Sequence, residues 1–175
     1  MLVNSSWQKV DEWMRLYGDK IIRVVYLIVN DYHVAEEITQ EVFVRVFNSV
    51  NSFRGDSSAY TWLYRIALNL SRNHLSRKAK ISFRPLKIEE KEDGLTESPE
   101  EKVVRKDMHK KIRSSIMQLP LIYREVIILH YFEELKVPEI ARVLRQPEGT
   151  VKSKLSRGRK ALENTLRKEV FADGR

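Results

Sequence analysis

Cationic and hydroxyl side chains share one side of the segment 147–168, and these are residue types that bind DNA. Lysine and arginine supply affinity for phosphates, and a bidentate arginine also reads guanine in the major groove. Val151 and Leu155 lie four positions apart, which places both on the opposite, buried side of a helix that begins at Pro147. The outward set comprises Thr150, Lys152, Ser153, Lys154, Ser156, Arg157, Arg159 and Lys160. A solvated basic surface helix is the alternative interpretation.

Two shorter helices are expected to position this segment. Apolar periodicity predicts helices over 120–132 and 137–144, and Pro138 fits a first helical turn, where its missing N–H costs nothing. Ala141 is small enough for two helices to approach closely, and residues 145–146 form the turn. A helix-turn-helix unit of this kind places its second helix in the major groove.

A second candidate site lies in the segment 53–78, within a stretch from 57 to 88 that has seven basic residues and no acidic one. Cations that follow a phosphate backbone and aromatic faces that hold unstacked bases together bind single-stranded nucleic acid. The aromatic candidates are Phe53, Tyr60, Trp62 and Tyr64. At helical spacing, one polar side carries Thr61, Arg65, Asn69, Arg72 and Ser76. The alternatives are that Tyr60 and Trp62 are core residues and that Asn69 is an ordinary surface residue.

Local signals indicate how this segment begins. Gly55 permits backbone angles that other residues avoid, so a loop is expected there. Ser57 or Ser58 can cap the helix that follows.

The composition favours a nucleic-acid partner and argues against an enzyme. The chain has 175 residues, 42% of them hydrophobic, and a net charge of +8. The absence of cysteine excludes disulfides, thiolate metal sites and a cysteine nucleophile. The four histidines are scattered, and there is no glycine-rich phosphate loop, nucleophile elbow or paired-acid motif. We therefore expect no catalytic residue, no metal and no cofactor.

The chain divides into two parts. Residues 89–101 hold seven acids against one lysine and few large apolar side chains, which is typical of a linker; a surface loop inside one domain is the alternative. Helical periodicity stands on both sides, and no run alternates at period two. We predict an all-α fold of two small helical domains, 1–80 and 102–175, joined by a flexible acidic linker over 81–101. With no signal peptide evident and residues 21–29 too short to span a bilayer, we expect a cytoplasmic protein.

Three motifs together resemble the extracytoplasmic-function (ECF) sigma factors of the bacterial sigma-70 family. Residues 35–47 resemble region 2.2, where Ile38, Val42, Val46 and Phe47 are expected to face inward. Phe-Arg-Gly-Asp-Ser at 53–57, followed by Thr-Trp-Leu-Tyr-Arg-Ile-Ala at 61–67, resembles regions 2.3 and 2.4. Residues 119–162, with Pro-Glu-Gly-Thr-Val-Lys-Ser-Lys at 147–154, resemble region 4.

The resemblance implies a transcription initiation factor that binds core RNA polymerase at its clamp helices and flap, and that recognises and melts promoter DNA. The polymerase-binding residues implied are Glu36, Glu37, Gln40 and Glu41. The minus-10 residues implied are Phe53, Arg54, Gly55, Asp56, Ser57, Ser58, Thr61, Trp62, Arg65, Asn69 and Arg72. The minus-35 residues implied are Glu148, Thr150, Lys152, Ser153, Lys154, Ser156, Arg157 and Arg159.

The resemblance also assigns finer roles. Residues 53–58 would form the loop of a pocket for a flipped base that Asn69 approaches, the acidic linker would follow the RNA-exit path, and an anti-sigma factor is implied as a further partner. Gly158 stands where many relatives have alanine, so we expect the last helix to fray or bend there.

Two other protein classes compete with this interpretation. A helix-turn-helix regulator with a helical sensor domain explains the C-terminal part equally well, but it does not explain the acid-free aromatic segment. Binding to an anionic membrane surface is weakly supported, because the basic helix has few bulky apolar residues beyond those its core needs.

Overall fold

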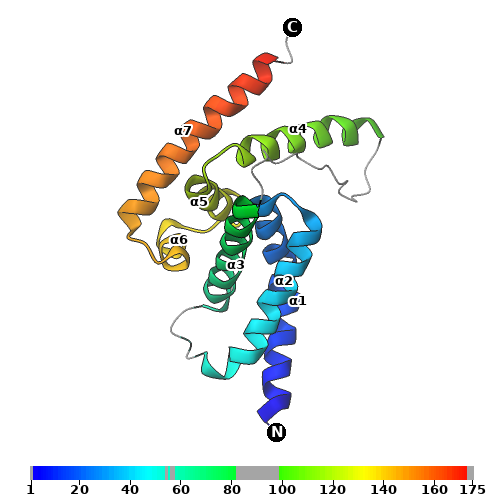
Figure 1. The fold of residues 1–175 in the computed structure, drawn as a ribbon, viewed down its shortest axis with the longest axis vertical. Coiled ribbons are helices and arrows are strands. Elements are labelled where there is room, and N and C mark those ends of the chain that lie inside the picture. The colour runs from blue at the N-terminus through cyan, green and yellow to red at the C-terminus, as the bar shows by residue number, and fades with distance from the viewer. Residues whose placement is uncertain (1, 54, 56–57, 82–98, 173–175) are drawn as a thin grey trace.

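The computed structural model describes residues 2–53, 55, 58–81 and 99–172, and within these it contains helices and no strand (Figure 1). The α-helices are α1 (Leu2–Val29), α2 (Tyr32–Ser49), α3 (Ala59–Ile81), α4 (Pro99–Met117), α5 (Leu121–Tyr131), α6 (Val137–Leu144) and α7 (Glu148–Ala172). A short 3₁₀ turn, η1 (Val50–Ser52), follows α2. The predicted all-α class is confirmed. Among the described helices, none combines the length and the apolarity that crossing a bilayer requires.

Helices α1, α2 and α3 pack into an N-terminal bundle. Its centre holds fully buried aliphatic side chains from all three helices, including Val24, Val42 and Leu63. The bend between α1 and α2 is fixed by Asn30, which adopts φ 56°, and by Asp31, whose carboxylate accepts a hydrogen bond from the Val34 N–H at 3.1 Å. This is a standard N-cap, and it sets the antiparallel approach of α2 to α1.

Helices α4 to α7 form a C-terminal bundle in which the expected helix-turn-helix is present. Helix α6 has the bounds that the sequence predicts, 137–144, and ends at Arg145 in the left-handed conformation with φ 53°. Val151 and Leu155 of α7 are buried, as the periodicity predicts. Arg145 therefore turns the chain from α6 into the helix that carries the basic face.

The expectation that α7 frays or bends at Gly158 is wrong, because α7 continues through it to Ala172. Gly158 is buried against α5. A Cβ at this position would lie 3.1 Å from Cγ1 of Ile127 and 3.3 Å from Cβ of Tyr123. The missing side chain thus allows α7 to pack closely on α5, and this contact outweighs the weak helix propensity of glycine.

The two bundles also pack against each other, with α1 against α4 and α5 and with α3 against α6. One buried cation joins the ends of α1 and α4 and the connection after α4: the Arg124 guanidinium donates to the carbonyl oxygens of Ile28 at 2.8 Å, Met117 at 2.6 Å and Leu119 at 3.0 Å. Most of the expected linker, residues 82–98, lies outside the described residues. Helix α3 ends at Ile81, and α4 begins at Pro99.

Candidate nucleic-acid interface

The basic face of α7 points away from the rest of the molecule. Of its predicted residues, Thr150 and Lys154 are half-buried, and the exposed ones are Glu148, Lys152, Ser153, Ser156, Arg157 and Arg159. The Lys154 ammonium donates to Oε1 of Gln146 at 2.8 Å, which ties the helix to the turn before it. Such a row of exposed cations on one helix face can contact successive phosphates along a groove.

The aromatic side chains at the start of α3 are packed on one another. The rings of Phe53 and Trp62 stack with centroids 5.0 Å apart, and Trp13 of α1 meets both edge-on. Trp13 is buried, whereas Phe53 and Trp62 are half-buried. The core interpretation of Trp62 is therefore correct in part. Lys9 lies over the Phe53 ring, with its Nζ 5.5 Å from the centroid, so the group also has a cation at its edge.

The loop before α3 and the first turn of that helix hold further residues predicted to bind the minus-10 element. Gly55 is exposed and has φ 77°, as expected for a position that needs glycine. Thr61 is buried rather than on the polar face, and its hydroxyl lies 2.8 Å from that of Ser58, which precedes the helix. Thr61 therefore holds the end of the loop against the first turn of α3. Arg54, Asp56 and Ser57 lie outside the described residues.

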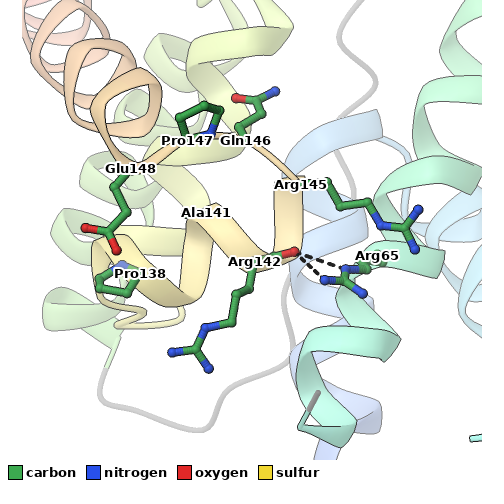
Figure 2. Close-up of a pocket in the computed structure, with 8 residues that line it drawn as sticks. All are labelled: Arg65, Pro138, Ala141, Arg142, Arg145, Gln146, Pro147 and Glu148. Atoms are coloured by element: carbon green, nitrogen blue, oxygen red, sulfur yellow. Dashed lines mark hydrogen bonds between the residues drawn. The ribbon is translucent and has the colours of Figure 1, made fainter. Parts of the chain in front are cut away.

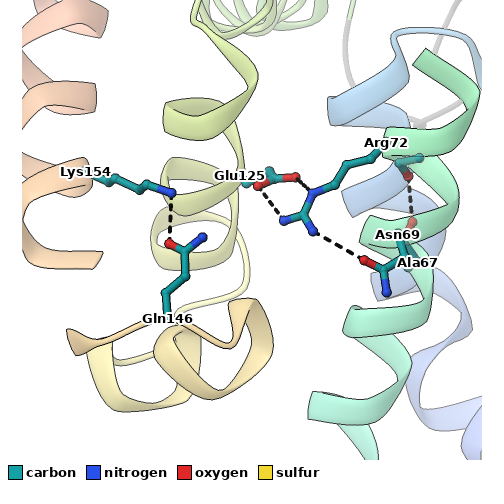
Figure 3. A network of polar contacts seen from close by, with 7 residues as sticks. Ala67, Asn69, Arg72, Glu125, Gln146 and Lys154 are labelled. Carbon is teal, nitrogen blue, oxygen red and sulfur yellow. Dashed lines mark hydrogen bonds and ion pairs between the residues drawn. The ribbon is translucent and has the colours of Figure 1, made fainter. Parts of the chain in front are cut away.

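Part of the polar side of α3 meets the C-terminal bundle, while Asn69 and Ser76 remain exposed. The Arg72 guanidinium donates to both carboxylate oxygens of Glu125, at 2.5 and 2.8 Å, and also to Oδ1 of Asn69 at 3.3 Å (Figure 3). This paired hydrogen bonding with Glu125 raises the pKa of Arg72. Arg72 is therefore held by α5, whereas the exposed Asn69 contacts only Arg72 of its own helix among the hydrogen bonds described.

Arg65 lies seven residues before Arg72 on α3 and contacts α6. Its guanidinium donates to the carbonyl oxygen of Arg142 at 2.7 and 3.0 Å (Figure 2). Burial lowers the pKa of Arg65, and the nearby Arg145 cation lowers it further. These residues line an open pocket of about 410 Å³, together with Gln146, Pro147 and Glu148 of the turn into α7. Its charged lining residues are three arginines and one glutamate, so the lining is predominantly basic.

Three carboxylates of the C-terminal bundle accept hydrogen bonds from the N-terminal bundle. Glu133 accepts from Arg23 at 2.8 and 3.1 Å and from the Tyr64 hydroxyl at 2.5 Å. Burial and this hydrogen bond both raise the pKa of Tyr64. The Tyr60 hydroxyl donates to Glu139 at 2.5 Å. Together with Arg72–Glu125 and Arg65–Arg142, these contacts are here named the bundle interface.

Sequence patterns do not predict the acidic side of this interface. The side chains of Glu125 and Glu133 are only 5% and 1% exposed, although isolated carboxylates in a helical sequence normally indicate solvent. Their partners stand 53 and 110 positions away in the chain. The only local signal is weak: Glu125 stands between the buried Arg124 and Val126, inside a largely apolar helix.

The predicted polymerase-binding residues lie together on α2, with Glu37 and Gln40 exposed and Glu36 and Glu41 half-buried. Glu41 pairs with Arg45 at 2.7 Å. Helix α2 also presents apolar groups to solvent. The expectation that Phe47 faces inward is wrong, because it is 37% exposed and meets Trp7 of α1 edge-on, and Val44 is 54% exposed. The surface is thus both acidic and apolar. Phe47 lies one position beyond the buried stripe that ends at Val46.

Among the residues that the structure describes, no group of histidine, aspartate and glutamate side chains could hold a metal ion. The side chains at these surfaces suit binding: cations for phosphates, aromatic faces for bases, and an acidic and apolar patch for protein.

Comparison with known proteins identifies the family. Residues 13–81 match Sigma-70 region 2, and residues 109–162 match Sigma-70, region 4. The chain is 37% identical over 162 residues to the ECF RNA polymerase sigma factor SigW of Bacillus subtilis, covering 87% of this chain and 86% of SigW. The chain belongs to the ECF RNA polymerase sigma factors. As a sigma factor, it acts in the initiation of transcription by RNA polymerase.

Further proteins are similar to this chain in sequence or in fold. The RNA polymerase sigma-H factor of Pseudomonas aeruginosa is 34% identical over 158 residues, which is 86% of this chain and 82% of that protein. Two solved structures share the fold: CnrH in complex with the cytosolic domain of CnrY (TM-score 0.71, 21% identity, 95% of each chain) and RpoE in complex with the anti-sigma factor NepR from Bartonella quintana (TM-score 0.72, 18% identity, 91% of this chain and 98% of that one). The predicted family and the two-part helical architecture are confirmed.

Proposed function

We propose that this sigma factor binds a promoter at two points, with the exposed face of α7 on the minus-35 duplex and the polar and aromatic side of α3 on the minus-10 element. The observation that carries the proposal is the outward row of cations on α7, held over a buried helix-turn-helix core. Lys152 and Arg157 extend into solvent and can contact phosphates without rearrangement. The predicted domains 1–80 and 102–175 then serve as the two DNA-binding domains.

The minus-10 element would be melted and held by α3 and its preceding loop. Unstacking a base costs a few kcal/mol, which stacking on aromatic side chains can offset. Phe53 and Trp62 already present such a stacked pair, and Asn69 has an amide that can pair with a base edge. Arg65 and Arg72 would follow the strand's phosphates once they are released from α6 and α5.

Core RNA polymerase is the proposed partner of α2. The polar set Glu36, Glu37, Gln40 and Glu41 suits a basic partner surface, and the exposed Val44 and Phe47 add the apolar contact that a stable protein interface needs. An anti-sigma factor is a further proposed partner, since the solved relatives include a complex with one. We further infer a cytoplasmic protein with no catalytic activity of its own, because initiation by this family uses the polymerase's active site.

A run-off assay with purified core polymerase and a promoter library tests the proposal. We expect promoter-specific transcripts that depend on both the sigma factor and the core enzyme. DNA binding and regulation without any need for core polymerase would instead favour a helix-turn-helix regulator. Lack of a promoter-specific transcript from every template would contradict the assignment.

A further inference from the structure

The aromatic group at the start of α3 carries a cation that comes from a different helix, α1. We propose that Lys9 is a further promoter contact, and that its ammonium binds a phosphate of the unpaired minus-10 strand beside a base that stacks on the Phe53 and Trp62 rings. This inference rests on the proposed function of α3 and its preceding loop. It extends that site to a helix that lies outside the segment 53–78.

Two aromatic rings hold the Lys9 ammonium in place. Its Nζ lies 5.3 Å from the centroid of the Trp13 ring and 5.5 Å from that of the Phe53 ring. Both distances are within the reach of about 6 Å over which a cation is attracted to a ring face. Trp13 is buried one helical turn after Lys9 on α1, so it provides a fixed support and acts as a positioning residue. The long lysine side chain therefore has fewer rotamers left to lose when it binds an anion.

The same ammonium still has hydrogen-bonding capacity. A lysine ammonium carries three N–H donors, and ring faces accept them only weakly. Within the described part of the chain, the interactions of Lys9 are these two ring contacts, and its side chain is exposed. Asp11, a nearby acid on α1, pairs with Arg15 at 3.0 Å. The donors of Lys9 thus point into solvent, where an anionic group can replace water.

A phosphate is the anion that fits this position. A base that stacks on Phe53 or Trp62 brings the phosphates of its own nucleotide with it, and sites for single strands combine aromatic faces with cations along the backbone. The strand-binding cations proposed above, Arg65 and Arg72, both belong to α3, so Lys9 adds one from a second helix. None of the hydrogen bonds of the bundle interface involves Lys9, so this contact needs no release from another part of the chain.

Three variants separate the charge of Lys9 from its packing on the rings. Lys9→Met keeps an unbranched side chain over the rings and removes the ammonium, whereas Lys9→Arg keeps the charge and the ring contacts. Lys20→Met is the matched control, because Lys20 is another exposed lysine of α1. Each protein is assembled with core RNA polymerase and bound to a promoter recovered from the run-off library, prepared with unpaired minus-10 bases. Fluorescence anisotropy over a salt series gives the affinity and its salt dependence.

We expect Lys9→Met to bind this promoter about fivefold more weakly than wild type at low salt, since one hydrogen bond to a charged group is lost. The slope of log K against log salt should become shallower by about 0.7, the value for one phosphate of a single strand. Lys9→Arg and Lys20→Met should keep the wild-type slope. Weaker binding with an unchanged slope would show that Lys9 only supports the rings, and a loss in Lys9→Arg equal to that in Lys9→Met would show that its charge binds nothing.

A scan of the DNA identifies the phosphate itself. Single phosphates of the unpaired strand are replaced, one at a time, by uncharged methylphosphonates. At one position the replacement should weaken binding by wild type about fivefold but leave binding by Lys9→Met nearly unchanged, because the partner is already absent. If every neutral phosphate costs the two proteins the same, the proposal is refuted. Failure of the proposed function would look different, because the wild-type protein would then give no promoter-specific transcript from the library.

Discussion

The close packing of Gly158 on α5 leads to a prediction that opposes the ordinary rule for helices. Replacing a helical glycine with alanine normally stabilises a protein by about 0.5–1 kcal/mol, because glycine loses more backbone entropy on folding. At Gly158 the added Cβ would meet Cγ1 of Ile127 at 3.1 Å and Cβ of Tyr123 at 3.3 Å. Ile127 is fully buried and has little room to move. Forcing a methyl group into such a core costs about 1–3 kcal/mol.

The two effects act in opposite directions, and packing is the larger. We expect Gly158→Ala to lower the free energy of unfolding by about 1 kcal/mol, which corresponds to a drop of about 3 °C in Tm for a chain of this size. Thermal unfolding followed by circular dichroism measures this directly. Gly18→Ala is the matched control, because Gly18 is also helical but a Cβ there has nothing within 4 Å. The control should raise Tm by about 2 °C.

A second comparison tests the stated cause. Ile127→Val removes the Cδ1 atom, which lies 3.4 Å from the position that the added Cβ would take, so it should absorb part of the cost of Gly158→Ala. The two changes are then expected to be non-additive by at least about 0.5 kcal/mol. If Gly158→Ala stabilises the protein as much as Gly18→Ala does, the packing argument is refuted and α7 tolerates a side chain at this position.

Three further predictions concern binding and pH. Lys152→Ala and Arg157→Ala should each weaken binding to a minus-35 duplex and reduce the salt dependence of log K by about one, as measured by anisotropy over a salt series. Asn69→Ala should weaken base discrimination in the minus-10 element, as measured by run-off transcription from single-base promoter variants. Acid should weaken the bundle interface at Glu139, because the hydrogen bond from Tyr60 lowers the pKa of that carboxyl group. A carboxylate with a lowered pKa stabilises the fold above about pH 4.3, and its contribution is lost as pH falls through the folded-state pKa.

Each of these has a control and a contrary result. For α7, Lys168→Ala removes an exposed cation beyond the proposed contact and should leave the duplex affinity nearly unchanged; an unaltered salt slope in Arg157→Ala would count against a phosphate contact. For α3, Asn73→Ala changes the same residue type at an exposed site one turn away, and unchanged discrimination in Asn69→Ala at every base would remove its reader role. For pH, Tyr60→Phe should flatten the dependence of the urea midpoint as the pH falls below about 4.3. A dependence identical to wild type would contradict the role of this hydrogen bond.

The elements that sequence predicts well are those whose signals are local. Helix α6 begins and ends where Pro138 and the turn at Arg145 predict, and the buried and exposed sides of α7 follow from the spacing of Val151 and Leu155. Such patterns are complete within one or two helical turns, so no knowledge of distant residues is needed.

The elements that sequence predicts poorly depend on distant partners. Glu133 is a polar residue in a short connection after α5, and only the presence of Arg23 and Tyr64 makes its burial favourable. Thr61 falls on the expected polar side of α3, but it is buried beside Ser58 of the preceding loop. Helix propensity alone likewise misjudges Gly158, because the residue it packs against, Ile127, belongs to a different helix, α5.

Arg124 keeps most of its hydrogen bonds when the two bundles separate, as the proposed minus-10 contact of α3 requires. Two of its three carbonyl partners, Met117 and Leu119, belong to its own bundle, and only Ile28 belongs to the other. Separation therefore leaves this cation partnered, and the Ile28 carbonyl at the end of α1 passes to water. Glu125 and Glu133 have no described hydrogen-bond donor within their own bundle, because their described donors all belong to the N-terminal bundle. After separation, Arg124 keeps its hydrogen bonds to Met117 and Leu119, whereas the carboxylates of Glu125 and Glu133 are hydrated by water. The face of the C-terminal bundle that had packed on the N-terminal bundle therefore becomes more negative.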